Sequence, residues 1–204
     1  MTFIGNTTLG QEQANLRGTV VDGKGLPVQG AKVMIGPEGV IRTQLIDSYT
    51  DSVGVFEVRG LRPGRYNVHA FKNEDGYGDP TFAFFALEQP ATLPPVEIVA
   101  GQTSNIRINL GSPAARIIGD VINADTGKPT EKARFRVTVA DRPEIFISSN
   151  PDGNGHFVIP VPSVPVELEV TMPGFVPWHS GRLLLPRGTM RTLTIPLKQI
   201  KPER

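Results

Sequence analysis

The sequence predicts an all-β protein, and three observations carry that prediction. The chain of 204 residues contains 22 glycines and 19 prolines, and both residue types interrupt helices. Many of the segments between them alternate apolar and polar side chains, which is the period-2 pattern of a sheet with one buried face. Turn signals recur at intervals of roughly 8–12 residues, a spacing typical of Greek-key β-sandwiches.

The first elements are two strands joined by a turn. Residues 16–21 (LRGTVV) and 31–35 (AKVMI) have strand character, and the turn DGKGLPVQG lies between them. A second turn, residues 51–54 (DSVG), follows, because Asp can accept hydrogen bonds from its own backbone and Gly can adopt a positive φ. Phe56 and Val58 then share one face of a strand and are expected to be buried.

The next turn is Arg62-Pro63-Gly64, and it leads into Tyr66. Pro and Gly suit the two central positions of a type II turn. Tyr66 is expected to re-enter the sandwich as a tyrosine corner does in Greek-key folds. A closing strand is predicted over residues 106–110 (IRINL).

The same order of segments returns in the second half of the chain. The matching positions are Gly18 and Gly119, Pro27 and Pro129, Ala31 and Ala133, Asp51 and Asp152, Gly54 and Gly155, and Phe56 and Phe157. The repeat of about 100 residues has the size of a domain and not of a solenoid unit. The second copy has no Pro-Gly-x-Tyr turn, and only the first has a long excursion between Phe71 and Gly101.

Composition argues against several classes of protein. The net charge is +1, and no basic stripe suggests a nucleic-acid partner. The best apolar run, residues 81–87, is far shorter than the roughly 18–20 residues of a membrane span. The chain has no cysteine, which excludes disulfides and thiol chemistry. Its N-terminus lacks the basic and hydrophobic regions of a signal peptide. We also expect the protein to be a monomer and to bind no cofactor.

Together the first-copy motifs resemble the carboxypeptidase regulatory-like domain. The resemblance is carried by G-x-V-x-D, G-x-P-V-x-x-A-x-V, D-x-x-G-x-F, L-x-P-G-x-Y and G-Q-T, namely Gly18, Val20, Asp22, Gly25, Pro27, Ala31, Val33, Asp51, Gly54, Phe56, Leu61, Pro63, Gly64, Tyr66, Gly101, Gln102 and Thr103. The second copy keeps the G-x-V-x-(D/N)…G-x-P-(V/T)-x-x-A pattern and the D-x-x-G-x-F motif but loses the L-x-P-G-x-Y turn, so it resembles a divergent relative.

The resemblance implies two tandem transthyretin-like (prealbumin-like, and thus Ig-like) seven-stranded β-sandwiches. The expected organisation is an N-terminal leader over residues 1–14, a first sandwich over 15–111 and a divergent second sandwich over 114–199. A fragment that begins near Ala114 is expected to fold alone. The family is also one of non-catalytic accessory modules on secreted or envelope proteins, which implies an extracytoplasmic location and a role as spacer, display or protein-docking unit.

Three aromatic or imidazole side chains are candidates for a different role, carbohydrate binding. Tyr77, Trp178 and His179 lie in Gly/Pro-rich segments that are expected to be exposed. A sugar site needs a ring on which to stack and a nearby polar group, so Trp178 would stack, His179 would bond a hydroxyl and Tyr77 would be the ring of the first copy. Buried rings would instead favour the accessory role.

Catalytic and metal sites find little support in the sequence. The three histidines stand in separate segments, without the H-x-x-E pair of zinc peptidases or the H-x-H pair of the intradiol dioxygenases that share the fold. The turn around Asp152 resembles the start of a calcium loop but lacks the later acidic ligand. An intramolecular isopeptide would need an inward lysine, whereas Lys32 is expected to point outward. No catalytic residue, metal ligand or cofactor is therefore predicted.

Overall fold

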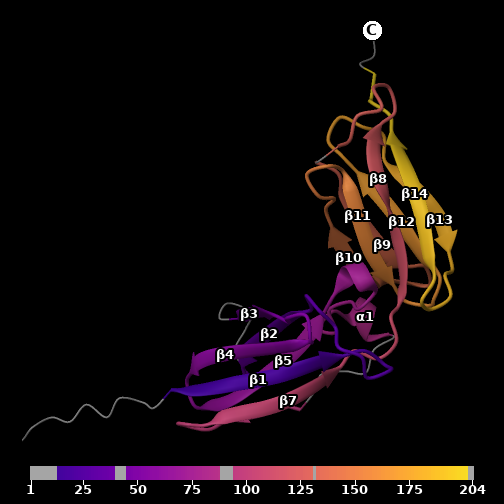
Figure 1. Ribbon diagram of the computed structural model, residues 1–204. Helices are drawn as coiled ribbons and strands as arrows, with labels where there is room; N and C mark the ends of the chain where they lie inside the picture. Colours follow the sequence, from indigo (N-terminus) through magenta and orange to yellow (C-terminus); the bar gives the residue numbers. More distant parts are fainter. Residues whose placement is uncertain (1–12, 40–44, 88–93, 131, 202–204) are drawn as a thin grey trace, which may run out of the picture. The chain divides into compact units, whose positions relative to one another are not determined.

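The computed structural model of the protein describes residues 13–39, 45–87, 94–130 and 132–201, and these residues form mainly β-strands (Figure 1). The chain divides into two compact units. Unit 1 comprises Met1–Val21, Gly25–Ala70 and Leu93–Asn109, and unit 2 comprises Asp22–Lys24, Phe71–Thr92 and Leu110–Arg204. Most of the predicted leader, residues 1–12, lies outside the described residues, and Ala14 already begins the first strand.

Unit 1 is a β-sandwich of two sheets. One sheet has the strand order β4-β1-β7, and the other has the order β3-β2-β5-β6. The central strand β1 runs antiparallel to β4 and parallel to β7. The strands are β1 (Ala14–Val21), β2 (Lys32–Pro37), β3 (Ile46–Tyr49), β4 (Val55–Leu61), β5 (Gly64–Phe71), β6 (Val96–Ile98) and β7 (Thr103–Asn109).

Unit 2 is a second sandwich with an equivalent layout. Its sheets have the orders β11-β8-β14 and β10-β9-β12-β13, and β8 runs antiparallel to β11 and parallel to β14. Adding seven to each strand number of unit 1 reproduces both orders, so the internal repeat in the sequence is also a repeat of topology. The strands are β8 (Ala115–Asn123), β9 (Arg134–Val139), β10 (Arg142–Ser149), β11 (His156–Val161), β12 (Val166–Thr171), β13 (Trp178–Leu183) and β14 (Met190–Leu197).

Phe56 and Phe157 occupy equivalent core positions, as predicted. They are 2 % and 4 % exposed. Phe56 stands opposite Gly18 in the β1–β4 ladder, and Phe157 stands opposite Gly119 in the β8–β11 ladder. A β-carbon on Gly18 would lie 2.5 Å from the ring of Phe56, so at this position the strand needs glycine to make room for the phenylalanine.

The segment after β5 differs from the sequence-based domain boundaries. Residues 71–92, which those boundaries place inside the first sandwich, belong to unit 2. The described part of the segment, residues 71–87, holds the 3-10 turn η2 (Asn73–Asp75) and the short helix α1 (Ala83–Ala86). Phe84 and Phe85 of α1, which are 1 % and 8 % exposed, join the hydrophobic core of unit 2.

Two contacts within unit 2 anchor this segment. The backbone N–H of Ala114 donates to the carbonyl of Gly76 at 2.9 Å. A side chain of Arg116 also donates to the carbonyl of Glu74. The rings of Phe84 and Phe85 meet edge to face, with centroids 5.3 Å apart.

In the described part of the chain, no helix has the length and apolar character needed to cross a membrane.

Candidate functional site

The two D-x-x-G turns hold the backbone in the same way in both units. Oδ1 of Asp51 accepts the N–H groups two and four residues later, at 3.0 and 2.8 Å. Oδ1 of Asp152 accepts from its corresponding positions at 2.8 and 2.9 Å. Gly54 and Gly155 close these turns with φ of 74° and 77°. The carboxylates therefore act as turn-forming acceptors, which is the scaffold interpretation of both stretches.

Tyr66 forms the predicted corner. Its ring is 7 % exposed, and its hydroxyl donates to the carbonyl of Arg62 at 3.0 Å. The turn before it is not type II, because Gly64 has a φ of 152° and the third residue of that turn type needs about 80°. The corner is thus closed by the side chain of Tyr66, after a Gly64 with a positive φ.

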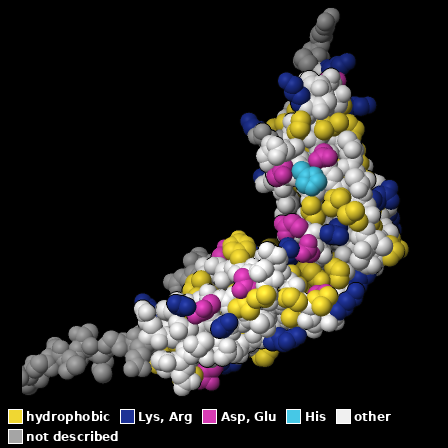
Figure 2. Space-filling model, in the orientation of Figure 1, with side chains coloured by type: hydrophobic (Ala, Val, Ile, Leu, Met, Phe, Trp, Pro, Cys, Tyr) yellow, Lys and Arg dark blue, Asp and Glu magenta, His cyan; other side chains and the backbone are white. Residues whose placement is uncertain are grey.

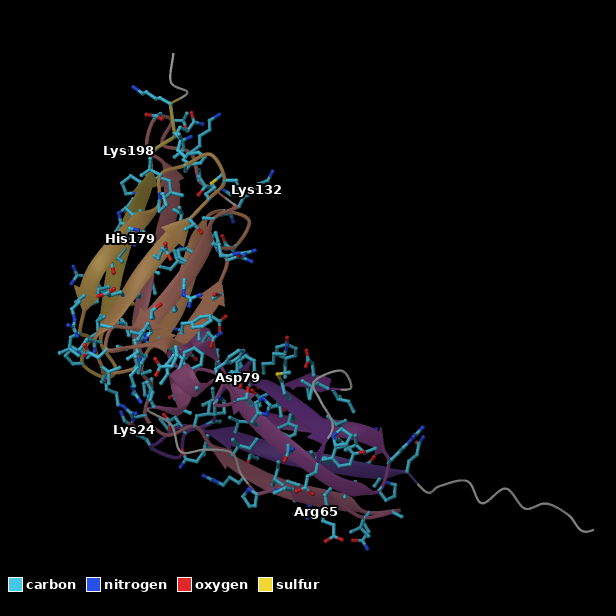
Figure 3. The ribbon with its side chains drawn as sticks, turned by 180° about the vertical axis from the view of Figure 1, so that it is seen from behind. Lys24, Arg65, Asp79, Lys132, His179 and Lys198 are labelled. Atoms are coloured by element: carbon cyan, nitrogen blue, oxygen red, sulfur yellow. The ribbon has the colours of Figure 1, made fainter. Side chains whose placement is uncertain are left out.

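Trp178 and His179 begin β13, an edge strand of unit 2. Trp178 is partly buried and packs against the core, while His179 is exposed (Figure 3). In the ladder with β12, His179 stands opposite Glu169. Because successive side chains of a strand point to opposite faces, the ring of Trp178 lies on the core side of β13 and the imidazole of His179 lies on the outer side, opposite Glu169.

Tyr77 lies in a different environment from the exposed one expected. It is 6 % exposed, and its backbone pairs with Lys72 at 2.7 and 3.0 Å. Burial, together with the nearby carboxylates of Asp22 and Asp75, raises the pKa of Tyr77 above its ordinary value. It belongs to unit 2 and not to the first sandwich, and it offers no open ring face for stacking. No hydrogen bond or ring contact among the described residues joins it to Trp178 or His179.

Charged groups on the surface form separate pairs. Arg59 hydrogen-bonds Glu57 at 2.8 Å and lowers the pKa of that carboxyl. Lys32, which points outward as predicted, pairs with Asp47 at 2.6 Å. On the face in Figure 2, basic and acidic side chains are interspersed within each unit. Among the described residues, no three His, Cys, Asp or Glu side chains are grouped to hold a metal ion.

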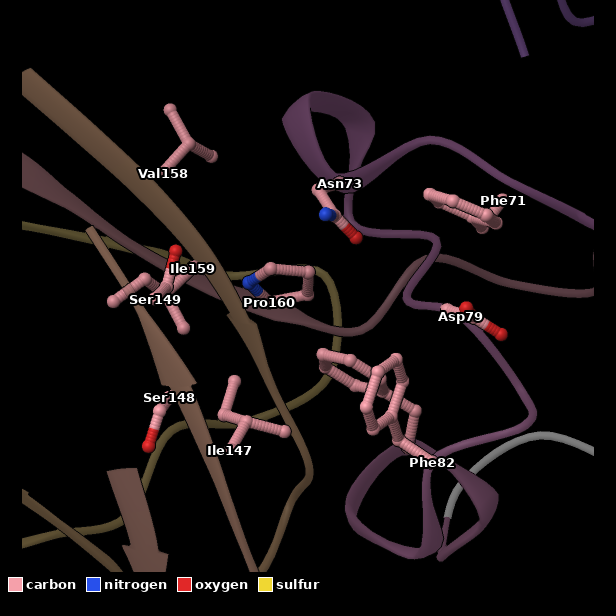
Figure 4. Close-up of a pocket in the computed structure, with 11 residues that line it drawn as sticks. Phe71, Asn73, Asp79, Phe82, Ile147, Ser148, Ser149, Val158, Ile159 and Pro160 are labelled. Carbon is pink, nitrogen blue, oxygen red and sulfur yellow. The ribbon is translucent and has the colours of Figure 1, made fainter. Parts of the chain in front are cut away.

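Unit 2 also contains a cavity of about 160 Å³ that sequence reasoning missed (Figure 4). One wall comes from the segment after β5 and the opposite walls from β10 and β11. The lining residues are Phe71, Asn73, Asp79, Phe82, Phe85, Ile147, Ser148, Ser149, Val158, Ile159 and Pro160. A signal was present in the sequence, because residues 81–87 form the strongest apolar run in the chain and stand outside the strand pattern.

Comparison with known proteins identifies a family for the first part of the chain. Residues 15–111 match the family model of the carboxypeptidase regulatory-like domain, which confirms the resemblance of the first copy. No curated protein matches the chain.

Several solved structures are similar to the chain at low identity and low TM-score. The Bacillus anthracis TIE protein is 14 % identical, with a TM-score of 0.40, and the match covers 93 % of this chain and 34 % of that one. The shaft pilin SpaA from Lactobacillus rhamnosus GG is 11 % identical, with a TM-score of 0.37 and coverage of 94 % and 100 %. A protein from Bacteroides uniformis described as carbohydrate binding is 12 % identical, with a TM-score of 0.34 and coverage of 42 % of each chain.

Proposed function

We propose that the chain is a non-catalytic tandem β-sandwich module that acts as spacer, display or protein-docking unit of an exported or cell-envelope protein. One observation carries the proposal: polar and glycine residues of the repeated motifs are engaged in holding the sandwiches. Asp51 and Asp152 accept backbone hydrogen bonds, and Tyr66 closes its corner on a carbonyl. Residues used in this way serve the scaffold rather than a reaction.

The second unit is, in this proposal, a divergent copy of the same family. Its strand order repeats that of unit 1. Gly155 and Gly54 also both allow a close approach of two backbone segments. A β-carbon on Gly155 would lie 2.8 Å from a carbonyl oxygen of the neighbouring strand, and one on Gly54 would lie 2.6 Å from the equivalent oxygen. The missing Pro-Gly-x-Tyr corner is the main departure. The extracytoplasmic location and a monomeric state also belong to this proposal.

Carbohydrate binding is the second candidate, and the partial exposure of Trp178 at the start of β13 is the observation that supports it. Trp178 keeps part of its ring exposed, and the exposed His179 lies on the other face of the strand. A single ring of this kind contributes on the order of 1 kcal/mol, so the affinity of one site would be weak, near millimolar.

Affinity electrophoresis in gels that contain plant or bacterial polysaccharides separates the two candidates. The accessory role predicts that the full chain migrates equally with and without polysaccharide and that Trp178 fluorescence is unchanged. Retardation that disappears in His179→Ala would establish the carbohydrate role instead. Phe146→Ala, which removes an exposed ring on β10, is the matched control and should leave migration unchanged in either case.

Fractionation of cells that produce the protein tests the location. Recovery in the envelope or the medium agrees with the proposal. Recovery in the cytosol alone would contradict it.

A further inference from the structure

The cavity in unit 2 is lined mainly by apolar side chains. The ring centroids of Phe82 and Phe85 are 6.4 Å apart and the rings are nearly perpendicular. Ile147 of β10 and Pro160 of β11 lie opposite them (Figure 4). A volume of about 160 Å³ is close to that of cavities that hold a single benzene ring, on the order of 150 Å³. Size and lining therefore favour one ring and exclude an extended sugar chain.

One polar atom in this apolar surface has no partner. Oδ1 of Asn73 is buried and accepts no hydrogen bond from the described residues. Figure 4 shows the amide of Asn73 directed into the space between Phe71, Pro160 and Phe82. The other buried polar group of the lining is already engaged, since Asp79 Oδ1 accepts from the N–H and hydroxyl of Thr81 at 2.9 and 2.7 Å.

An unpaired buried acceptor is costly, and a donor placed opposite it removes that cost. We infer that the cavity binds a single aromatic ring that carries one hydrogen-bond donor, with the ring between Phe82, Phe85 and Pro160 and the donor on Asn73 Oδ1. Phenol is the simplest molecule with this chemistry. Binding of a small aromatic ligand goes beyond the proposed accessory role. It does not require that the protein docks to a partner or is exported.

Phenol and toluene form a matched pair of probes, because they have the same shape and differ only in the hydroxyl donor. In ¹H–¹⁵N NMR titrations of the full chain, both should shift the amides of the non-proline residues in 71–85 and 147–149 and those of Val158 and Ile159. The affinity should be on the order of 1 mM, as expected for a ligand of this size. Phenol should bind about fivefold more tightly than toluene, which is the usual gain from one hydrogen bond.

Asn73→Leu tests the recognition itself. The variant removes the unpaired acceptor at similar volume, so unit 2 should stay folded and the preference for phenol over toluene should disappear. Asn154→Leu, at an exposed position of the turn at residues 152–155, is the matched control and should keep the preference. Either of two results overturns the inference: no shifts in the lining amides with 10 mM phenol, as for a cavity filled only by water, or equal binding of both probes by the parent.

A phenol can reach the site as a small molecule or as the tyrosine of a partner peptide. Titration with Gly-Gly-Tyr-Gly-Gly distinguishes the sources. If the peptide binds as tightly as phenol, the opening admits a protein chain. If phenol binds and the peptide does not, the ligand is a free small molecule.

Discussion

Phe56 and Phe157 each fill the centre of one sandwich, where they are 2 % and 4 % exposed. Truncation to alanine removes a buried ring and leaves a cavity, so each variant should lose about 3–5 kcal/mol in the unfolding of its own unit. Calorimetry or urea unfolding followed by NMR in each unit measures this loss.

Phe146→Ala provides the control for this pair. Its ring is 41 % exposed on β10 and lies 3.5 Å from the guanidinium of Arg136. Loss of such an exposed cation–π contact should cost at most about 1 kcal/mol. A Phe157→Ala variant that is no less stable than Phe146→Ala would contradict the core assignment.

Gly155 and Gly174 show two different reasons why a position in this fold requires glycine. Both have a positive φ, 77° and 82°. A β-carbon at Gly155 would lie 2.8 Å from the carbonyl oxygen of Val121, whereas one at Gly174 would meet nothing within 4 Å. Gly174→Ala should therefore show only the backbone strain, about 1 kcal/mol, and Gly155→Ala should cost at least about 1 kcal/mol more. Equal losses in thermal unfolding would show that the close approach contributes nothing.

Tyr77 makes unit 2 sensitive to alkaline pH. Burial raises its pKa above the ordinary value of 10.0, so the folded unit holds the phenol proton more tightly than the unfolded chain does. The stability linked to this group is fully present below about pH 10 and is lost as the pH rises through the folded pKa. Between pH 9 and pH 11, the melting temperature of unit 2 should fall more in the parent than in Tyr77→Phe. Tyr49→Phe, at a 62 % exposed position of unit 1, should behave like the parent.

At the scale of elements, the short helix α1 completes the core of the second sandwich. Phe84→Ala should destabilise unit 2 by about 3–5 kcal/mol and leave the transition of unit 1 unchanged. Phe82→Ala removes a ring that is 40 % exposed and should have a much smaller effect.

Because α1 completes the core of unit 2, a fragment of residues 71–201 should melt more than about 10 °C above a fragment of residues 114–201. Equal melting of the two fragments would show that the second copy needs no help from α1.

The elements that could be predicted from the sequence are those set by local chemistry. The turn at Asp51, the corner at Tyr66 and the burial of Phe56 follow from side-chain types and their spacing over a few residues. The packing of Phe84 and Phe85 does not, because nothing local indicates which of two similar cores an apolar run will join. The cavity and the unpaired oxygen of Asn73 were missed for the same reason, since the walls of the cavity come from segments more than 60 positions apart in the chain.

At the scale of the whole molecule, the repeat in the sequence and the compact units have different boundaries. The repeat divides near residues 111–113, whereas the chain passes between the units at 21/22, 24/25, 70/71, 92/93 and 109/110. A protease site inserted between Ser112 and Pro113 would cut the chain into two pieces, with the segment of residues 71–92 on the N-terminal piece. That segment should hold the pieces together through the core of unit 2, and they should elute as one species in size-exclusion chromatography. Separation without denaturant would contradict the assignment.

The placement of α1 also limits how the gene can change. Unequal crossing-over between tandem repeats normally adds or deletes a whole copy and leaves its neighbours intact. Here a deletion of residues 15–111 would also remove the codons for Phe84 and Phe85, whose rings lie in the core of the surviving sandwich. The first copy therefore cannot be lost from the gene unless new side chains fill the core of the second sandwich.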